Sequence, residues 1–280
     1  MVTFGKYNID YCDPTPPPLM KGRRRSVMKI TILGVKINNE SSSQITAEII
    51  SRIRQNQATF IATPNPEMLV LARRDGQFKD ILNAADIAIP DGFGLILAAK
   101  FLHLPLKEKV SGTDLAEKII REDGGELRVF LLGAEAGVGE RAAGYLKKIN
   151  PAAQIVGIES GGKLNADCRF QNEELILQRI KNSGANLLLV AFGQIKQETW
   201  IYHNLSNLPG IAAIGIGGAL DFYAGTAKRA PNILRRLGLE WLWRLVLEPK
   251  RIKRIINAVI VFSFLILLPL VRGGREGSRE

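Results

Sequence analysis

Short apolar segments alternate with segments of helical periodicity along most of this chain, and this alternation limits the folds open to it. The apolar segments are 29–35, 58–62, 87–90, 127–132, 154–158, 186–192 and 211–216. Strands that alternate with helices form βαβ units, in which helices cover both faces of a parallel sheet. The sequence therefore predicts one α/β domain over residues 28–225, without internal repeats or a second domain of this kind.

The two ends of the chain differ from this body. Residues 1–27 carry a proline-rich run and no apolar core of a signal peptide, so we expect a flexible leader or a misassigned start. Translation from Met1, Met20 or Met28 is left open. Residues 226–256 are expected to form a basic helical appendage, and residues 257–280 an apolar membrane-associating segment with a polar tail.

Most of the positive charge lies in the appendage. Residues 228–254 carry a net charge of +7, whereas residues 30–227 sum to −1. Trp241 and Trp243 lie within the basic stretch, and an apolar run at 258–271 follows it. This run is shorter than the ~20 residues of a spanning helix, so we expect partial or interfacial insertion rather than a crossing. The pattern favours contact with anionic lipid or a phosphorylated, lipid-linked substrate.

Several other classes of protein are disfavoured. The charge is confined to the ends and no nucleic-acid-binding motif is present, so no nucleic-acid partner is expected. Cys12 and Cys168 are too few and too distant for a disulfide framework or a zinc site. His103 and His203 are isolated and no D-x-D pair occurs, so we expect neither a metal nor another cofactor.

Ligands of parallel α/β sheets bind beyond the carboxyl ends of the strands, so the loops there carry the candidate residues. Asp91 follows an apolar strand and precedes Gly92 and Gly94, which allow a ligand close to the backbone. It is the candidate general base for a substrate hydroxyl. Its spacing is equally that of a helix N-cap, and the sequence leaves both roles open.

Neutral polar groups in the same loops suit sugar hydroxyls. Thr63, Asn65 and Gln197 have this chemistry, with helix capping and loop closure as their alternative roles. Lys196, Gln197 and Glu198 are also compatible with a solvated helix start. The glycine-rich turn from Gly133 to Gly139, which includes Gly137, lies at the start of a helix, whose N–H groups would suit a diphosphate; tight strand-to-helix packing is the alternative.

Taken together, these loops resemble the WecG/TagA/CpsF family of bacterial glycosyltransferases. The resemblance extends in order from Met28 to Arg254. Its motifs are Thr63–Met68, Pro90–Gly94, Ser111–Asp114, Phe192–Gly193 with Lys196–Trp200, Gly215–Asp221, Ala224–Gly225, Arg229–Pro231 and Gly238–Leu242.

The resemblance implies a Rossmann-like enzyme that moves an N-acetylmannosamine-type sugar from a UDP-sugar to a polyprenyl-diphosphate-linked GlcNAc acceptor. It implies inversion without a metal, at the inner membrane face, in cell-envelope, teichoic acid or exopolysaccharide synthesis. Asp91 would be the base, and Thr63, Asn65 and Gln197 would line the site. Arg244, Arg251 and Arg254 would come from an appendage that closes over the substrate. Lys109, Gly133, Gly137, Glu198 and Asp221 complete the expected substrate contacts.

Three residues depart from the family pattern. Lys109 stands where an arginine is usual, Ile195 where a proline is usual, and Leu220 where a phenylalanine is usual. Lysine keeps the charge but loses the bidentate fork of arginine, which affects a diphosphate or sugar contact.

The sequence therefore predicts a peripheral-membrane glycosyltransferase and leaves a homo-oligomer open. Two alternatives remain at this point. One is a Rossmann-type NAD(P) oxidoreductase, which the missing G-x-G-x-x-G motif disfavours. The other is a non-catalytic, membrane-docking module that binds nucleotides.

Overall fold

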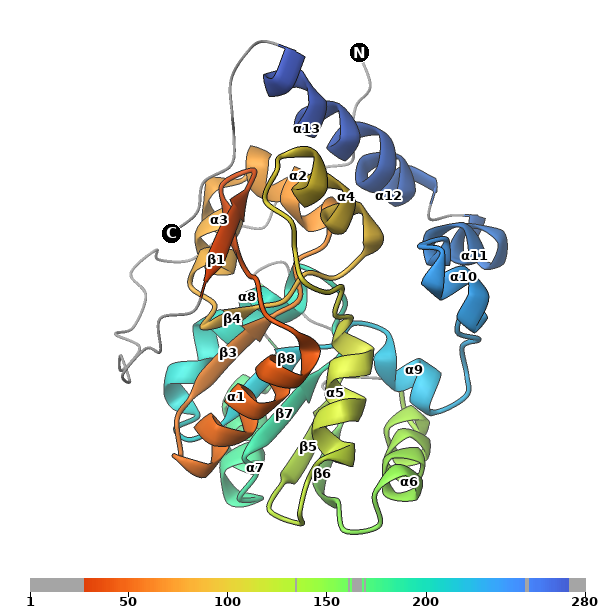
Figure 1. Cartoon of the computed structure of the whole chain (residues 1–280). Helices are drawn as coiled ribbons and strands as arrows, with labels where there is room; N and C mark the ends of the chain where they lie inside the picture. The colour runs from red at the N-terminus through yellow and green to blue at the C-terminus, as the bar shows by residue number, and fades with distance from the viewer. Residues whose placement is uncertain are drawn as a thin grey trace.

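The computed structural model describes residues 28–271, except 134, 161, 163–167, 169, 250 and 251. The side chains of 232, 236, 244, 253, 254, 257 and 268–271 are likewise outside the description. The expected leader at 1–27 and the polar tail beyond 271 lie outside the described residues. Figure 1 shows a central sheet with helices packed around it and a group of C-terminal helices at its edge.

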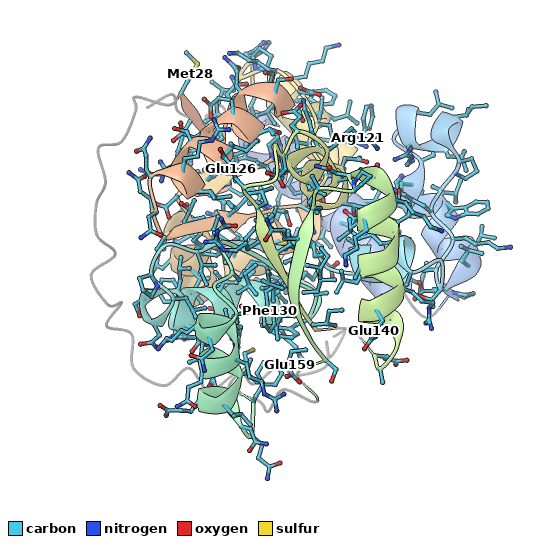
Figure 2. The ribbon with its side chains drawn as sticks, turned by 90° about the horizontal axis from the view of Figure 1, so that it is seen from below. Met28, Arg121, Glu126, Phe130, Glu140 and Glu159 are labelled. Carbon is cyan, nitrogen blue, oxygen red and sulfur yellow. The ribbon has the colours of Figure 1, made fainter. Side chains whose placement is uncertain are left out.

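A six-stranded parallel sheet forms the centre, as the sequence predicted, in the order β4-β3-β8-β7-β5-β6. Its strands are β3 (Thr59–Ala62), β4 (Ile87–Ala88), β5 (Arg128–Leu132), β6 (Gln154–Glu159), β7 (Leu187–Val190) and β8 (Ala212–Gly215). Seen from below, β5 and β6 lie side by side between α6 and α7 (Figure 2). All six strands end at one edge, which gathers the loops singled out above.

Helices connect the strands, most of them in the expected places with small shifts at their ends; the third and the ninth helix were not expected. They are α1 (Ser42–Arg54), α2 (Pro66–Arg74), α3 (Gly76–Asn83), α4 (Phe93–Phe101), α5 (Gly112–Arg121), α6 (Val138–Ile149), α7 (Glu173–Asn182), α8 (Lys196–Asn204) and α9 (Ala219–Tyr223), with a 3₁₀ turn η1 (Leu205–Asn207).

Two hydrophobic cores cover the two faces of the sheet. Along β5, Val129 and Leu131 belong to one core, and Phe130 and Leu132 belong to the other. The first core contains residues of α1, α5, α6 and α9, and the second contains residues of α2, α3, α4, α7 and α8. Successive side chains of a strand point to opposite faces of the sheet. Because both faces are buried here, the strands appear in the sequence as continuous apolar segments.

Two elements near the N-terminus differ from the expectation. Residues 29–35 form the start of an antiparallel hairpin, β1 (Lys29–Ile32) and β2 (Val35–Asn38), and not one strand. Its two-residue turn, Leu33 and Gly34, has positive φ at both positions, as a type I′ hairpin turn requires. Helix α3 was not expected; the Asp75 side chain caps it by accepting a hydrogen bond from the Phe78 N–H.

The C-terminal region is helical but broken. Its elements are α10 (Asn232–Arg236), α11 (Glu240–Leu247), α12 (Ile252–Ile256), the π-helical η3 (Asn257–Val261) and α13 (Phe262–Val271). The appendage expected over 226–256 is therefore not one continuous helix, since α11 ends at Leu247. Pro249 explains the break, because proline and the residue before it disfavour helix continuation.

The last helices pack back onto the body. Helix α13 contacts α2 and α4, and η3 contacts α2 (Figure 1). Phe262 and Ile266 are 2% and 3% exposed and belong to the core that contains α2 and α4. No helix within the described residues is both long enough and apolar enough to cross a membrane.

Candidate active site

A cavity of about 400 Å³ lies where the loops after β3 and β4 meet the C-terminal helices. Its walls come from α2, α4, the loop before α5, the start of α11 and the α12–α13 segment. Asn65, Asp91 and Lys109 line it, so the structure brings three of the predicted site residues together.

Asp91 lies at the polar side of this cavity. Its backbone N–H donates to the Pro64 carbonyl at 2.9 Å, which joins the loops after β3 and β4. The N-cap of α4 is Gly92, with φ of 97°, so Asp91 is not the cap that its spacing also allowed. Glu67 and Glu240 line the cavity too, but each lies in the first turn of a helix, where a carboxylate stabilises the helix dipole. Asp91 remains the candidate base.

Asn65 and Thr63 hold the end of β3 in place. The Asn65 side chain accepts a hydrogen bond from the Met68 N–H at 3.0 Å and so caps α2. Helix capping was the alternative role predicted for this residue. Its amide nitrogen also donates to Gln194 Oε1 at 3.2 Å. Thr63 Oγ1 donates to the Gly215 carbonyl at 3.2 Å and is buried, which ties β3 to β8. Asn65 lines the cavity, whereas Thr63 is not among its lining residues.

Gln197 and Glu198 form a buried pair beside the end of β8. Gln197 Nε2 donates to Glu198 Oε1 at 2.7 Å, and Gln197 Oε1 accepts from the Gly217 N–H at 2.9 Å. Both side chains are buried, with exposures of 2% and 0%, so the predicted solvated helix start is wrong for these two residues. Burial raises the pKa of Glu198 to about 7, despite the opposing hydrogen bonds from Gln197 and the Ile195 N–H.

The same pair fixes a strained loop. Ile195 precedes α8 with φ 73° and ψ −58°, a conformation that is rare and strained for a β-branched residue. Its N–H donates to Glu198 Oε2 at 2.7 Å. Strain of this kind persists only where the surroundings fix it. Glu198 therefore holds the loop after β7, although its carboxylate does not line the cavity.

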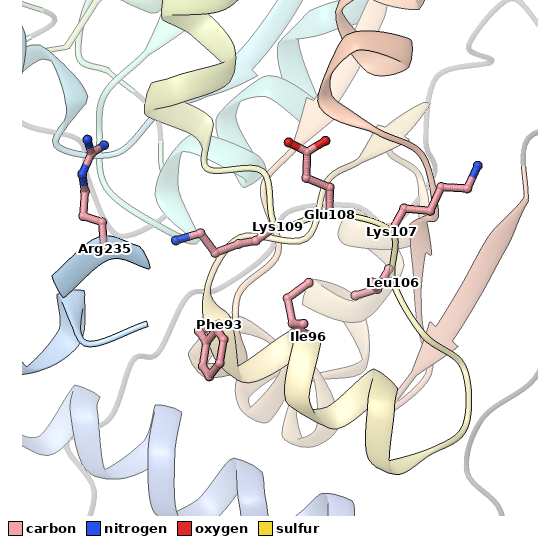
Figure 3. Close-up of a pocket in the computed structure, with 7 residues that line it drawn as sticks. All are labelled: Phe93, Ile96, Leu106, Lys107, Glu108, Lys109 and Arg235. Carbon is pink, nitrogen blue, oxygen red and sulfur yellow. The ribbon is translucent and has the colours of Figure 1, made fainter. Parts of the chain in front are cut away.

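Lys109 faces two cavities at once. It lines the cavity of Asp91 and also an open cavity of about 540 Å³. Figure 3 shows this open cavity between Phe93 and Ile96 of α4, the 106–109 loop and Arg235 of α10. The Lys109 side chain extends toward α10. Its ammonium group is thus placed at the junction of two spaces that a ligand can fill.

An ion-pair cluster beside Lys109 was not singled out from the sequence. Arg229 lines the Asp91 cavity and pairs with Asp114 at 2.7 Å, and Arg235 lies 3.4 Å from the same carboxylate. Ser111 Oγ, the N-cap of α5, donates to Asp114 at 2.7 Å. Burial acts to raise the pKa of Asp114, but the Ser111 hydrogen bond and Arg229 outweigh it and lower the pKa. The signal was present, because the family motifs include both Ser111–Asp114 and Arg229–Pro231.

The other predicted contacts lie outside the cavity lining. The Gly133 N–H donates to the Glu159 carbonyl, and a Cβ at this position would lie 2.6 Å from Phe192 Cδ1. Close packing, the alternative role, is therefore what Gly133 shows. Gly137 is the left-handed N-cap of α6, and Asp221 lies in α9, where Thr226 Oγ1 donates to its carboxylate at 3.3 Å. Substrate contacts of these residues remain predictions.

The three tail arginines cannot be placed in the site. Arg251 lies outside the described residues, and the side chains of Arg244 and Arg254 lie outside the description. Their neighbour Trp241 lines the cavity, and Trp243 Nε1 donates to the Lys228 carbonyl at 3.3 Å. Among the described residues, no three His, Cys, Asp or Glu side chains gather as a metal site.

Comparisons with known proteins place this chain in a family. A profile described as "Glycosyl transferase WecG/TagA/CpsF family" matches residues 30–276. A protein of Staphylococcus aureus, named N-acetylglucosaminyldiphosphoundecaprenol N-acetyl-beta-D-mannosaminyltransferase, is 31% identical over 247 residues, 87% of this chain and 94% of the relative. A Bacillus spizizenii protein of the same name is 29% identical over 222 residues, 79% and 84% of the two chains. The chain thus belongs to the WecG/TagA/CpsF family of glycosyl transferases.

Proposed function

We propose that this protein transfers N-acetylmannosamine from a UDP-sugar to the GlcNAc of a polyprenyl-diphosphate-linked acceptor, with inversion and without a metal, in cell-envelope or exopolysaccharide synthesis. The observation that carries the proposal is the position of Asp91. It follows β4, an edge strand of the parallel sheet, lies one residue before the N-cap of α4, and lines a cavity with Lys109 and Arg229. The names of the relatives supply the sugar and the acceptor.

The reaction needs one base and stabilisation of one leaving group. An acceptor hydroxyl oxygen attacks the anomeric carbon from the face opposite to UDP, and its proton passes to the Asp91 carboxylate. The bond from the anomeric carbon to the phosphate oxygen breaks, and UDP leaves with the electron pair. Fixed positive groups stabilise this charge in place of a metal. Lys109 and Arg229 are the described candidates, and Arg244, Arg251 and Arg254 are proposed to join them.

The outer face of the last helices supports a location at the lipid surface. Ile256, Ile260 and Phe264 recur every four residues on the α12–α13 segment and are 37%, 63% and 60% exposed. The opposite face of the same segment is buried on α2 and α4. A helix that is apolar all round is normally buried or in a membrane. We therefore propose that this protein is peripheral, on the cytoplasmic membrane face.

A donor panel tests the proposed reaction. The purified chain is incubated with several UDP-sugars and a GlcNAc-diphosphate acceptor bearing a short lipid, with and without EDTA. We expect UDP release and one added N-acetylhexosamine by mass from UDP-N-acetylmannosamine alone. An α-linked donor should give a β-linked product by NMR, and EDTA should not reduce the rate.

Three results would each remove part of this proposal. If no product formed with any of the UDP-sugars, the assignment as a transferase from a UDP-sugar to the GlcNAc-diphosphate acceptor would be removed. A loss of activity in EDTA that Mg²⁺ or Mn²⁺ restores would remove metal independence. If an Arg251→Ala or Arg254→Ala variant turned over the soluble acceptor as fast as the wild type, the proposed role of that arginine in stabilising the leaving group would be removed.

A further inference from the structure

The cavity that contains Asp91 has two chemically different ends. At one end lie Asn65, Asp91, Lys109, Ser111 and Arg229, all with polar side chains. At the other end, α4 contributes Leu97 and Phe101, and the η3–α13 segment contributes Val259, Phe262, Ile266 and Leu267, with Ser263 as its one polar lining residue. One continuous space thus joins the candidate base to an apolar chamber between two helices.

The wall of the apolar end is fixed by packing. Phe262 and Ile266 are buried in the core with α2 and α4, so the inner face of α13 is anchored. Leu97, Phe101 and Leu267 line the cavity and are also 42%, 55% and 44% exposed. They therefore form the rim, and the apolar end opens between α4 and α13.

The proposed donor does not account for this chamber. A UDP-sugar is polar over its whole length and would leave an apolar chamber without a matching group. The acceptor named for the relatives joins a sugar diphosphate to a polyprenyl chain. Its polar and apolar parts follow the same order as the two ends of the cavity.

We propose that the apolar end binds the first isoprene units of the acceptor, next to its diphosphate. This inference rests on the proposed function and adds a subsite to it. The hydroxyl of the acceptor sugar lies at Asp91, the acceptor diphosphate lies between that sugar and the apolar end, and the chain passes between α4 and α13 to the rim. The outer residues Ile260 and Phe264 lie on the same helical segment, so the chain can enter from lipid without crossing water.

Soluble acceptors of increasing chain length test the subsite without a membrane. GlcNAc-diphosphate acceptors with one, two, three and four isoprene units are compared below their aggregation concentrations. For the wild-type protein, KM should fall on the order of 10-fold for each unit that enters the chamber, because each buries several apolar carbons. KM should then level off once the chamber is full.

Two variants fill the chamber from opposite walls. Val259→Trp and Leu97→Trp should each abolish most of the dependence of KM on chain length. Leu97 is at the rim, so its variant tests the subsite even if Val259→Trp fails to fold. Ile260→Trp is the matched control: it places the same side chain on the outer face of η3 and should retain the wild-type dependence.

The outcomes separate the subsite from the reaction. Sugar transfer to every acceptor with a KM independent of chain length would overturn the subsite and leave the proposed function standing. Retained chain-length dependence in folded forms of both tryptophan variants would overturn it too. Transfer to none of the acceptors would instead remove the proposed function on which the subsite rests.

Discussion

At the scale of single residues, Asp91 and Glu198 are two carboxylates with different surroundings. Asp91 lines the cavity beside Lys109, whereas Glu198 is wholly buried and accepts hydrogen bonds from Gln197 and from the backbone. The first is proposed to take a proton from a substrate, and the second holds the loop after β7 through its hydrogen bond from the Ile195 N–H. Each role leads to a different measurement.

Asp91→Asn should lower turnover by ~10²–10⁴-fold, because the amide cannot accept the hydroxyl proton. UDP affinity should change little, since the substitution preserves shape. Turnover is measured by UDP release, and affinity by calorimetry. Asp75→Asn is the matched control at the N-cap of α3, where asparagine caps as well as aspartate. If Asp91→Asn turned over at the wild-type rate, Asp91 would not be the general base.

Glu198→Gln should change how stability depends on pH. Burial raises the pKa of Glu198 from 4.5 to about 7, so the folded protein holds its proton more tightly than the unfolded chain does. This contribution is complete below pH 4.5 and is lost as the pH rises through 7, a loss of ~3 kcal/mol in all.

The comparison for this prediction uses denaturant unfolding at pH 5, 6, 7 and 8. The wild-type free energy of unfolding should fall relative to that of Glu198→Gln as the pH rises. The variant cannot ionise and lacks this component. Parallel pH curves for the two proteins would mean that Glu198 does not titrate in this range.

At the scale of elements, the turn between α10 and α11 is fixed by one close approach. Gly238 has φ of 75°, and a Cβ there would overlap the ring of Phe93 at the start of α4. This turn leads into Glu240 and Trp241, which line the cavity. The cavity wall therefore depends on a position that has no room for a side chain.

Gly238→Ala should displace α10 and α11 from α4 and lower turnover about 10- to 100-fold, because small displacements of positioning elements are costly. The two cores do not include Gly238, so the body should stay folded by circular dichroism. Gly144→Ala in α6 is the control: no atom lies within 4 Å of its new Cβ, and turnover should be unchanged. Equal turnover in both variants would contradict this account of the wall.

Local chemistry explains which elements the sequence could predict. Asn65 before Pro66 marked the start of α2, because capping depends on neighbouring residues alone. The β1–β2 hairpin was missed, since Leu33–Gly34 lacks the Asn-Gly signature of such turns. The Asp75 cap of α3 was a readable signal that was not used.

The candidate site was predictable only in part, for a similar reason. Asp91 could be found because the ends of parallel strands meet at one edge. The pairing of Arg229 with Asp114 joins residues 115 positions apart, and no local pattern predicts which cation meets which carboxylate. The apolar run after residue 257 could be recognised in the sequence. Its position as one wall of the cavity could not be predicted from it.

At the scale of the whole molecule, the last helices serve two surfaces at once. Phe262 and Ile266 bury the inner face, so deleting residues 257–280 would also expose the core. Substitutions on the outer face test membrane contact more cleanly. A double variant, Ile260→Gln with Phe264→Gln, should weaken binding to anionic vesicles at least about tenfold, because two side chains lose apolar burial.

Turnover of this double variant on a soluble, single-isoprene acceptor should match that of the wild type. Vesicle co-sedimentation and UDP release are measured on one preparation, at low and high salt. High salt should reduce the contribution of basic residues and leave the apolar one. Leu175→Gln makes the same kind of change on an exposed residue of α7 and should alter neither measurement. Unchanged vesicle binding in the double variant would place the membrane contact elsewhere.

The strand order also sets when the molecule is completed during synthesis. The N-terminal strands form two separate pairs, β3 with β4 and β5 with β6, and the central strands β7 and β8 join them. Residue 215, the end of β8, follows the end of β3 by about 150 residues. At 5–20 residues per second the ribosome takes ~8–30 s over this distance. The apolar α13 begins 47 residues after the end of β8, so every strand of the sheet leaves the ribosome before this segment does.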